Sequence, residues 1–226
     1  IYREMNTPKH LIIVAGGTGS RIKNELPKQF IEINGTPIIV HTLRKFLQYN
    51  ASIHIYIAVH KDYEAHLKLV LHKFLPNQKV EITVGGETRF HSVKNALALV
   101  PNTGIVAIHD AARPMVSKDT ISRCFKAAQV HGNATPCVPV NDSLRQVKGK
   151  YNKSVLRNDY KIIQTPQCFK VELIKKSFEQ NYSESFTDDA SVFEKAGNTI
   201  TLTEGNVENI KITYPIDLIL AQHLLK

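Results

Sequence analysis

A glycine-rich stretch near the N-terminus, Ala15-Gly16-Gly17-Thr18-Gly19-Ser20-Arg21, follows directly on an apolar run at residues 10–15. Glycine carries no Cβ, so such a loop can bring backbone N–H groups close to phosphate oxygens. Arg21 and Lys28 stand seven positions apart in this region. Two cations so placed suit a triphosphate whose charge must be held while one phosphorus is attacked. The stretch therefore predicts a nucleoside triphosphate site, and an ordinary turn with basic surface residues is the alternative.

Other well-known ligand-binding patterns match this chain poorly. A dinucleotide-binding loop needs G-x-G-x-x-G, whereas Ile22 stands three residues beyond Gly19, and the G-K-[ST] of a P-loop is absent. The histidines lack H-E-x-x-H spacing, and Cys124, Cys137 and Cys168 lack C-x-x-C spacing. No G-x-S-x-G motif indicates a covalent nucleophile. The sequence therefore gives no support to a dinucleotide-binding loop, a P-loop, a zinc site or a covalent nucleophile.

A pair of carboxylates, Asp188 and Asp189, follows Thr187. The two could form a metal site, but a second interpretation is favoured. Thr187 is predicted to cap a helix, and acidic residues in the first turn of a helix interact favourably with its dipole.

The formal net charge of +9 indicates a polyanionic partner or a broadly basic surface. Basic residues occur in ones and twos, without the basic run or aromatic cluster of nucleic-acid-binding proteins, so we expect no nucleic acid partner. No stretch approaches the ~20 apolar residues of a membrane helix, and no signal peptide is evident. We expect a cytoplasmic protein that has no membrane partner and uses its charge on small phosphorylated ligands.

Strands and helices alternate along the chain and must position these residues. Apolar, β-branched runs predict strands at residues 10–15, 53–59, 80–84, 104–109 and 134–140, with two more near 199–203 and 209–213. Helices are expected at 37–49 behind a Thr36 cap, at 62–74, 89–99, 117–131 and 171–180, after Thr187, and from Pro215 onward. This order predicts an α/β fold of doubly wound type with a mostly parallel sheet.

A polar stretch at residues 141–163 interrupts this pattern, and its short apolar alternation turns about Gly149. It predicts a protruding β-arm that acts as a lid, a subunit contact or a mobile surface loop. The arm lies within a single predicted domain at residues 5–226. Residues 1–4 precede a plausible initiator, Met5, and are either a cloning remnant or native sequence.

The glycine-rich loop and Pro27-Lys28-Gln29 together resemble the signature loop of the Rossmann-like nucleotidyltransferases that act on sugars and polyol phosphates. Further stretches resemble the methylerythritol-phosphate cytidylyltransferase family in particular. They are Gly85-Gly86-Glu87-Thr88-Arg89 with Ser92, His109-Asp110-Ala111-Ala112-Arg113-Pro114, Val138-Pro139-Val140-Asn141-Asp142-Ser143, Ile163-Gln164-Thr165-Pro166-Gln167, Phe186-Thr187-Asp188-Asp189-Ala190-Ser191 and Glu204-Gly205-Asn206 through Asn209-Ile210-Lys211. Together with the glycine-rich loop, these stretches run in order from residue 11 to beyond residue 211, which is nearly the whole chain.

The resemblance implies a role for each matching residue. Catalytic cations would be Arg21 and Lys28 on the CTP phosphates and Lys211 on the reacting α-phosphate. The remaining nucleotide contacts would come from Ala15, Gly16, Gly17, Gly86, Glu87, Ser92 and Ala111, with Gly86, Glu87 and Ser92 facing the cytosine. The polyol phosphate would be bound by Asp110, Ser143, Arg157, Thr165 and Thr187.

The resemblance also implies a cofactor and an oligomer. Asp110 follows an expected strand, where open α/β sheets bind ligands, and could contact Mg²⁺ instead of the polyol or merely cap a loop. In the family the arm crosses to a second subunit, so Arg157 and Thr165 would complete the partner's site in a homodimer. Ser143 and Glu87 replace the Thr and Asp that family members often carry there, and both keep the functional group.

The implied reaction is transfer of CMP from CTP to 2-C-methyl-D-erythritol 4-phosphate, which yields a CDP-polyol and pyrophosphate. A phosphate monoester is largely dianionic at pH 7, so it needs no general base to act as a nucleophile. A ribitol-5-phosphate cytidylyltransferase shares the same loop and chemistry and stays open as an alternative. A non-catalytic nucleotide sensor is disfavoured, because it would not need Arg21, Lys28 and Lys211 around the reacting phosphorus.

Overall fold

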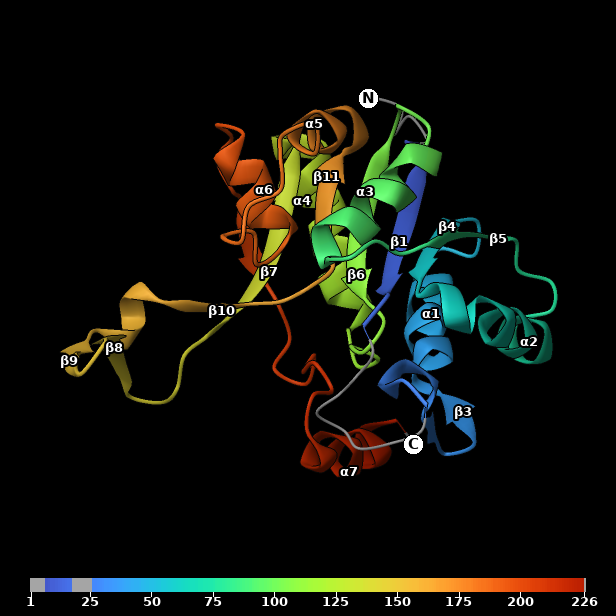
Figure 1. Ribbon diagram of the computed structural model, residues 1–226, viewed down its shortest axis with the longest axis horizontal. Coiled ribbons are helices and arrows are strands. Elements are labelled where there is room, and N and C mark those ends of the chain that lie inside the picture. The colour runs from blue at the N-terminus through green and yellow to red at the C-terminus, as the bar shows by residue number, and fades with distance from the viewer. Residues whose placement is uncertain (1–6, 18–25, 226) are drawn as a thin grey trace.

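The computed structural model describes residues 7–17 and 26–225 and is organised around one mixed sheet. Its strands run in the order β10-β7-β11-β6-β1-β4-β5, with β12 also beside β7 (Figure 1). Their bounds are β1 (Lys9–Ala15), β4 (His54–Val59), β5 (Val80–Val84), β6 (Ile105–Asp110), β7 (Asn133–Pro139), β10 (Lys161–Ile163), β11 (Gln167–Lys170) and β12 (Leu202–Glu204). Strand β1 is parallel to β4 and β6, and β4 is parallel to β5. The predicted α/β fold with a mostly parallel sheet is confirmed.

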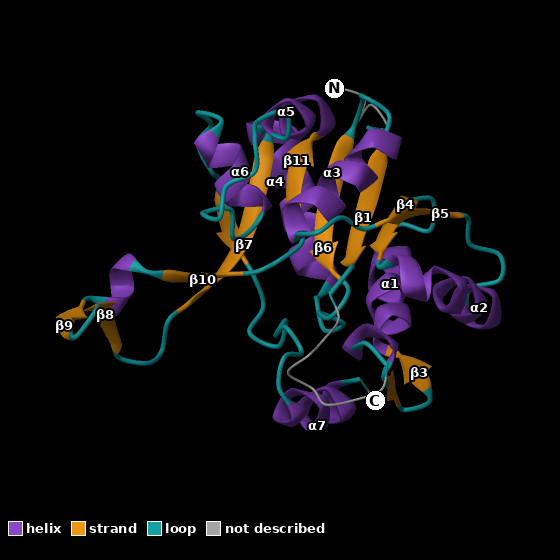
Figure 2. Ribbon diagram, in the orientation of Figure 1, coloured by secondary structure: helices purple, strands orange, loops and turns teal. Residues whose placement is uncertain are grey.

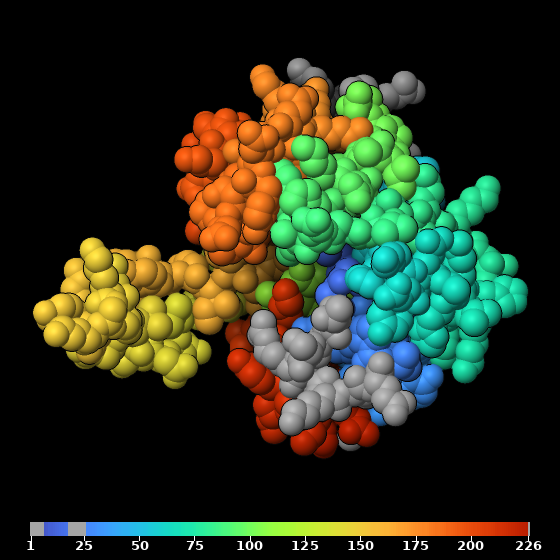
Figure 3. All heavy atoms as spheres, viewed as in Figure 1, coloured from blue at the N-terminus to red at the C-terminus, as the bar shows by residue number. Residues whose placement is uncertain are grey.

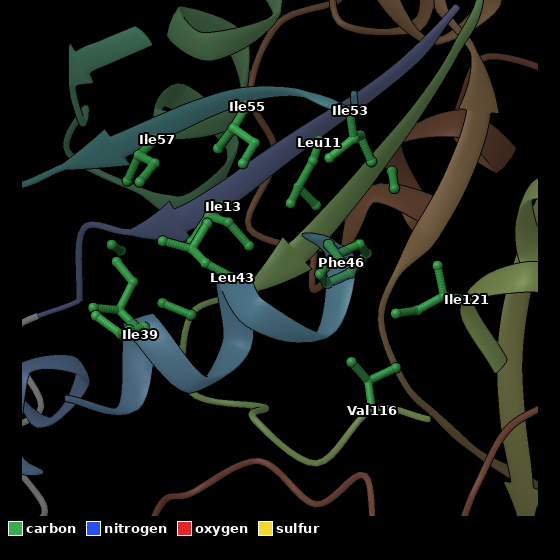
Figure 4. Close-up of a cluster of buried hydrophobic side chains, with 14 of the residues drawn as sticks. Leu11, Ile13, Ile39, Leu43, Phe46, Ile53, Ile55, Ile57, Val116 and Ile121 are labelled. Atoms are coloured by element: carbon green, nitrogen blue, oxygen red, sulfur yellow. The ribbon is translucent and has the colours of Figure 1, made fainter. Parts of the chain in front are cut away.

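Helices cover both faces of this sheet, because successive side chains of a strand point to opposite faces. Leu11 and Ile13 of β1 pack on one face with residues of α1 (Ile38–Tyr49), α2 (Glu64–Phe74) and α4 (Lys118–His131) (Figure 4). Ile12 packs on the other face with residues of α3 (Arg89–Leu99), α5 (Val171–Ser177) and α6 (Asp189–Lys195). Every β1 position from Leu11 to Ile13 is therefore apolar and buried, as the sequence pattern indicated.

Two strand predictions differ from the structure. Strand β11 was not predicted, and it lies between β6 and β7 and is antiparallel to both. It is only four residues long and leads directly into α5, so its pattern merges with that of the helix. The predicted strand at 209–213 is wrong, because Ile212 makes a single backbone hydrogen bond to Ala112 rather than a ladder.

Two helices also differ from the prediction in the residue that caps them. Thr36 and Pro37 form β3 (Thr36–Pro37), which pairs with β2 (Glu32–Ile33), and Pro37 rather than Thr36 is the N-cap of α1. Asp188 rather than Thr187 caps α6, since its carboxylate accepts a hydrogen bond from the Ser191 N–H at 2.8 Å. Asp forms this cap as well as Thr does, so the sequence alone allowed either residue.

The arm is a hairpin of β8 (Leu144–Lys148) and β9 (Tyr151–Val155) that turns at Gly149, whose φ is 57°. It projects away from the remainder of the chain (Figures 2 and 3). The chain returns through β10, which pairs with β7. At the carboxyl edge of the sheet, α7 (Pro215–Leu224) packs through Ala221 in a small apolar cluster with Ile33 and Ile212. No helix among residues 7–17 and 26–225 is long and apolar enough to cross a membrane.

Candidate active site

Two adjoining cavities open where β1, β5 and β6 end. The first, about 330 Å³, is bounded by the loops after β1, β5 and β6 and by the segment near Lys211. The second, about 270 Å³, lies on the side of Thr165 and Thr187. Arg89, Asp110 and Lys211 line both cavities and so form the wall between them. The carboxyl ends of strands are the usual ligand-binding edge of an open α/β sheet.

A buried amide anchors the chain at the end of β1. Gln29 donates hydrogen bonds from Nε2 to the carbonyl oxygens of Ala15 at 2.8 Å and Gly17 at 3.2 Å. Its position in the 3₁₀ turn η1 (Lys28–Phe30) places the adjacent Lys28 in the first cavity. Arg21 lies outside the described residues.

The loop after β5 is folded tightly around Ser92. The Ser92 Oγ accepts the N–H of Gly86 at 3.1 Å and donates to the carbonyl oxygen of Thr88 at 3.0 Å. A Cβ added to Gly86 would lie 2.3 Å from the Cβ of His91. This close approach requires glycine, and the loop presents Gly86 and Glu87 to the first cavity.

Lys28 joins the first loop to the segment at residues 211–213. Its Nζ donates a hydrogen bond to the carbonyl oxygen of Ile212 at 2.7 Å. Lys211 and Thr213 flank Ile212 and also line the first cavity. Two lysine side chains from distant parts of the sequence therefore lie on one side of this cavity.

Asp110 lies in the wall between the two cavities and contacts three cationic side chains. Its Oδ1 lies 3.4 Å from the Arg89 Nε, and its Oδ2 lies 3.0 Å from the Lys211 Nζ and 3.4 Å from the Arg113 Nε. Burial by itself would raise the pKa of Asp110, but Arg89, Lys211 and Arg113 outweigh it and hold this pKa well below its ordinary value. Asp110 is a fixed negative charge rather than a general base.

These contacts do not give Mg²⁺ a ready set of protein ligands. No group of three or more His, Cys, Asp or Glu side chains suited to a metal occurs in residues 7–17 and 26–225. Both oxygens of Asp110 are paired with cations, which would also repel a divalent ion. The assignment of a metal to Asp110 therefore finds no support in its contacts.

A buried hydrogen-bond chain holds the backbone beside Asp110. The carbonyl oxygen of Arg113 can only accept, so His109 Nε2–H donates to it at 3.0 Å and His109 Nδ1 is left as an acceptor. Thr165 donates its hydroxyl hydrogen to that Nδ1 at 2.9 Å, and its Oγ1 accepts the N–H of Asp110 at 3.2 Å. Burial lowers the pKa of His109 to about 4, so the imidazole is neutral at pH 7.

The pKa of His109 predicts a specific loss of stability in acid. The unfolded chain takes up a proton at His109 below pH 6.5, whereas the folded chain resists it down to about pH 4. Unfolding is therefore favoured as the pH falls through this window, by about 3 kcal/mol in total. Denaturant titrations between pH 7 and pH 4 should show this contribution as a slope whose total is smaller by about 3 kcal/mol in the His109→Gln variant, which keeps the part that the buried His10 and the half-buried His41 supply. The exposed His72→Gln variant is the control, and an unchanged slope in His109→Gln would contradict the prediction.

Comparison with known proteins decides the family. A model of the 2-C-methyl-D-erythritol 4-phosphate cytidylyltransferase family matches residues 9–226. The chain belongs to this family. The enzyme of this name from Phocaeicola vulgatus is 42% identical over 217 residues, which are 96% of this chain and 99% of that one. The Bacteroides fragilis enzyme is 44% identical over 214 residues, which are 95% of this chain and 98% of that one.

Solved structures of the family share the fold. The Francisella tularensis 2-C-methyl-D-erythritol 4-phosphate cytidylyltransferase has a TM-score of 0.80 and 31% identity, and the match covers 96% of this chain and 100% of that one. The Thermus thermophilus enzyme has a TM-score of 0.76 and 29% identity, with 97% and 98% covered. The family resemblance seen in the sequence is thus confirmed along nearly the whole chain.

Most residues expected from the family to form the site lie at the two cavities. The first is lined by Lys28, Lys211 and Asp110 and by all of the expected nucleotide contacts, namely Ala15, Gly16, Gly17, Gly86, Glu87, Ser92 and Ala111. The second is lined by Asp110, Lys211, Thr165 and Thr187.

Two expected residues are elsewhere. Ser143 precedes β8 and Arg157 follows β9, so both belong to the exposed arm and line neither cavity. Thr165, by contrast, lies beside Asp110 of its own chain. Thr165 and Arg157 were both expected at a partner's site; Thr165 lines the second cavity of its own chain, whereas Arg157 belongs to the arm.

Sequence reasoning gave no role to three residues that build the site. Gln29 holds the first loop, and Arg89 and Arg113 neutralise Asp110. All three stand inside stretches that identified the family. Asp110 was expected at the edge of the sheet, but no counter-charge was named for it. A buried carboxylate needs one, and Arg113, three positions further on, was the residue in the sequence that could have indicated it.

Proposed function

We propose that this protein transfers CMP from CTP to 2-C-methyl-D-erythritol 4-phosphate and releases pyrophosphate. Family membership supports both substrates. The observation that carries the proposal is the shared wall of Arg89, Asp110 and Lys211, because transfer between two ligands needs two adjoining cavities with positive charge at their junction. With CTP in the first cavity and the polyol phosphate in the second, the reacting groups would meet at Lys211.

The reaction follows from positioning and charge. An oxygen of the acceptor phosphate, already a dianion near pH 7, forms a bond to the α-phosphorus. The bond from that phosphorus to the oxygen bridging to the β-phosphate breaks, and pyrophosphate leaves with the electron pair. We assign Lys211 to the α-phosphate and Lys28 with Arg21 to the leaving pyrophosphate. Asp110 holds Lys211 in place and takes no proton.

Magnesium is expected to enter with the nucleotide. Its preferred ligands are oxygens, and it is commonly bound by substrate phosphates with one or two carboxylates. The Asp110 carboxylate is committed to cations, so the substrate phosphates would supply the ligands of the ion.

The choice of base tests the nucleotide half of the proposal. With the acceptor held constant, pyrophosphate release should be fast with CTP and about 10²-fold slower or more with UTP and ATP, because polar groups that pair with cytosine would be left unpaired. Equal rates with ATP would contradict the assignment of Gly86, Glu87 and Ser92. No release with any nucleotide would favour a nucleotide sensor.

A homodimer formed through the arm would bring Arg157 to a partner's acceptor cavity. The arm leaves large apolar side chains in solvent, with Val147 69% exposed and Leu156 74% exposed. Such exposure on a protruding hairpin favours an interaction surface. Arg157 also lines neither cavity of its own chain, and a second copy would bring it to the acceptor.

Removing apolar side chains from the arm should reduce dimer formation without reducing the affinity for CTP. Replacing Val147 and Leu156 by serine removes apolar surface and is expected to shift the protein toward monomer and to lower turnover, while CTP affinity stays within about threefold. Sedimentation velocity and calorimetry measure the two properties. The matched control replaces Leu69 and Val130, both exposed on helices, by serine. An arm variant that becomes monomeric but keeps full turnover would contradict the role of the arm.

A further inference from the structure

Arg89 joins three segments of the chain at the wall between the cavities. It is the first residue of α3 and follows the loop that presents Gly86 and Glu87. Its Nη1 and Nη2 donate to the two carboxylate oxygens of Asp189 at 2.8 and 2.7 Å, and its Nε faces the Asp110 Oδ1 at 3.4 Å. One planar guanidinium thus spans α3, the end of β6 and the start of α6.

The geometry leaves Arg89 a single orientation. A guanidinium carries its donors in a rigid fork, so a bidentate contact to Asp189 also fixes the direction of Nε. Asp189 is fully buried. Burial raises the pKa of the Asp189 carboxyl and the Arg89 guanidinium opposes that shift, so the charged pair depends on both partners.

An aromatic cluster makes a second connection between the same segments. The His91 ring lies 5.3 Å from the Tyr182 ring, and the Phe90 ring is stacked 5.5 Å from the Phe186 ring. His91 packs directly behind Gly86, and Phe186 precedes Thr187 at the second cavity. The loop after β5 and the segment at 182–189 therefore form one packed unit that reaches both cavities.

The charges at the wall explain why the position of Arg89 matters. Arg89, Arg113 and Lys211 face two carboxylates, Asp110 and Asp189. If Arg89 were released from Asp189, its guanidinium would turn fully toward Asp110. It would then compete there with Lys211, whose Nζ is 3.0 Å from the Asp110 Oδ2.

We propose that Arg89 is a positioning residue that, anchored by Asp189, sets the place of Asp110 and through it of Lys211, and so aligns the two cavities for transfer. This inference rests on the proposed function. It assigns to Arg89 and Asp189 an effect on the rate of transfer rather than on the affinity for CTP. The two residues act on that rate as one unit.

The test compares Arg89→Lys, Asp189→Asn and the double variant with the wild-type protein. Lysine keeps the charge but its single ammonium cannot bridge two carboxylates, and asparagine keeps the shape of aspartate without its charge. Each single variant should lower kcat by roughly 10- to 100-fold, as misplacement of reacting groups by about 1 Å does. The double variant should be no slower than the slower single variant. Calorimetric titration should give a CTP Kd within about threefold of wild type at unchanged stoichiometry.

The control is Lys68→Gln, which breaks an exposed ion pair with Glu64 on α2 and should leave kcat within about twofold. Single variants with wild-type kcat would overturn the role of Arg89, and so would losses that add in the double variant. A reduced CTP stoichiometry would overturn it as well, because it would attribute the lower kcat to a loss of folded protein. A wild-type protein that releases no pyrophosphate would instead overturn the proposed function and the inference with it.

Discussion

Replacing Lys28 by alanine is expected to lower the rate of pyrophosphate release by roughly 10²–10³-fold, the usual effect of removing one group that stabilises charge in a transition state. Lys28 lines the first cavity, and its Nζ lies 2.7 Å from the carbonyl oxygen of Ile212. In the proposed reaction its charge faces the leaving pyrophosphate, on which negative charge accumulates as the bond to the α-phosphorus breaks. Steady-state kinetics with saturating CTP and acceptor measure the effect.

The Lys28→Ala variant should keep its fold, because the hydrogen bond to the Ile212 carbonyl that it removes has a charged donor and is worth about 1.5–3 kcal/mol. Circular dichroism and a denaturant titration check this. The control is Lys126→Ala on the exposed face of α4, which removes the same charge far from the cavities and should leave turnover unchanged. A folded Lys28→Ala protein with nearly wild-type turnover would refute the role of this lysine.

Replacing Asp110 by asparagine is expected to reduce both turnover and stability. The substitution keeps the shape of the side chain but leaves Arg89, Arg113 and Lys211 without their shared anion. Removing one partner of a buried ion pair typically destabilises a protein by about 3–5 kcal/mol. Turnover should fall by about 10²-fold, because Lys211 is no longer held at the junction of the cavities.

Denaturant unfolding and pyrophosphate release measure these two effects on the same preparation. Asp119→Asn is the matched control, because Asp119 lies exposed in the first turn of α4 and should change the unfolding free energy by less than about 1 kcal/mol. An Asp110→Asn protein as stable and as active as wild type would show that the cation cluster does not depend on its central carboxylate.

Much of the fold follows from local pattern. The apolar run of β1 is buried on both faces, and such runs alternating with helices occur where helices cover both sides of a parallel sheet. Strand β11 escaped prediction because Gln167, its first residue, is polar yet buried. The Gln167 amide accepts the N–H of Ala190 and donates to Asp188, contacts that only the folded chain supplies.

The residues of the candidate site likewise include some that local patterns predict and others that only the folded chain brings together. Lys28, Asp110 and Lys211 were predicted because each stands within a stretch of recognisable spacing, and the structure gathers them at one cavity. The pairing of Arg89 with Asp189 could not be predicted, since the two are 100 positions apart and no local pattern brings α3 to α6. Asp189 was expected to serve the helix dipole, and it lies in that first turn, but its charge is taken up by Arg89.

The acceptor is tested most directly by phosphorus NMR of two parallel reactions. Each contains the purified protein, CTP and Mg²⁺, one with 2-C-methyl-D-erythritol 4-phosphate and the other with ribitol 5-phosphate at equal concentration. The first reaction should convert CTP into free pyrophosphate and a diphosphate that links cytidine to the polyol, while the second stays largely unreacted. Preferential conversion of ribitol 5-phosphate, or conversion of neither acceptor by a protein that binds CTP, would contradict the proposed function.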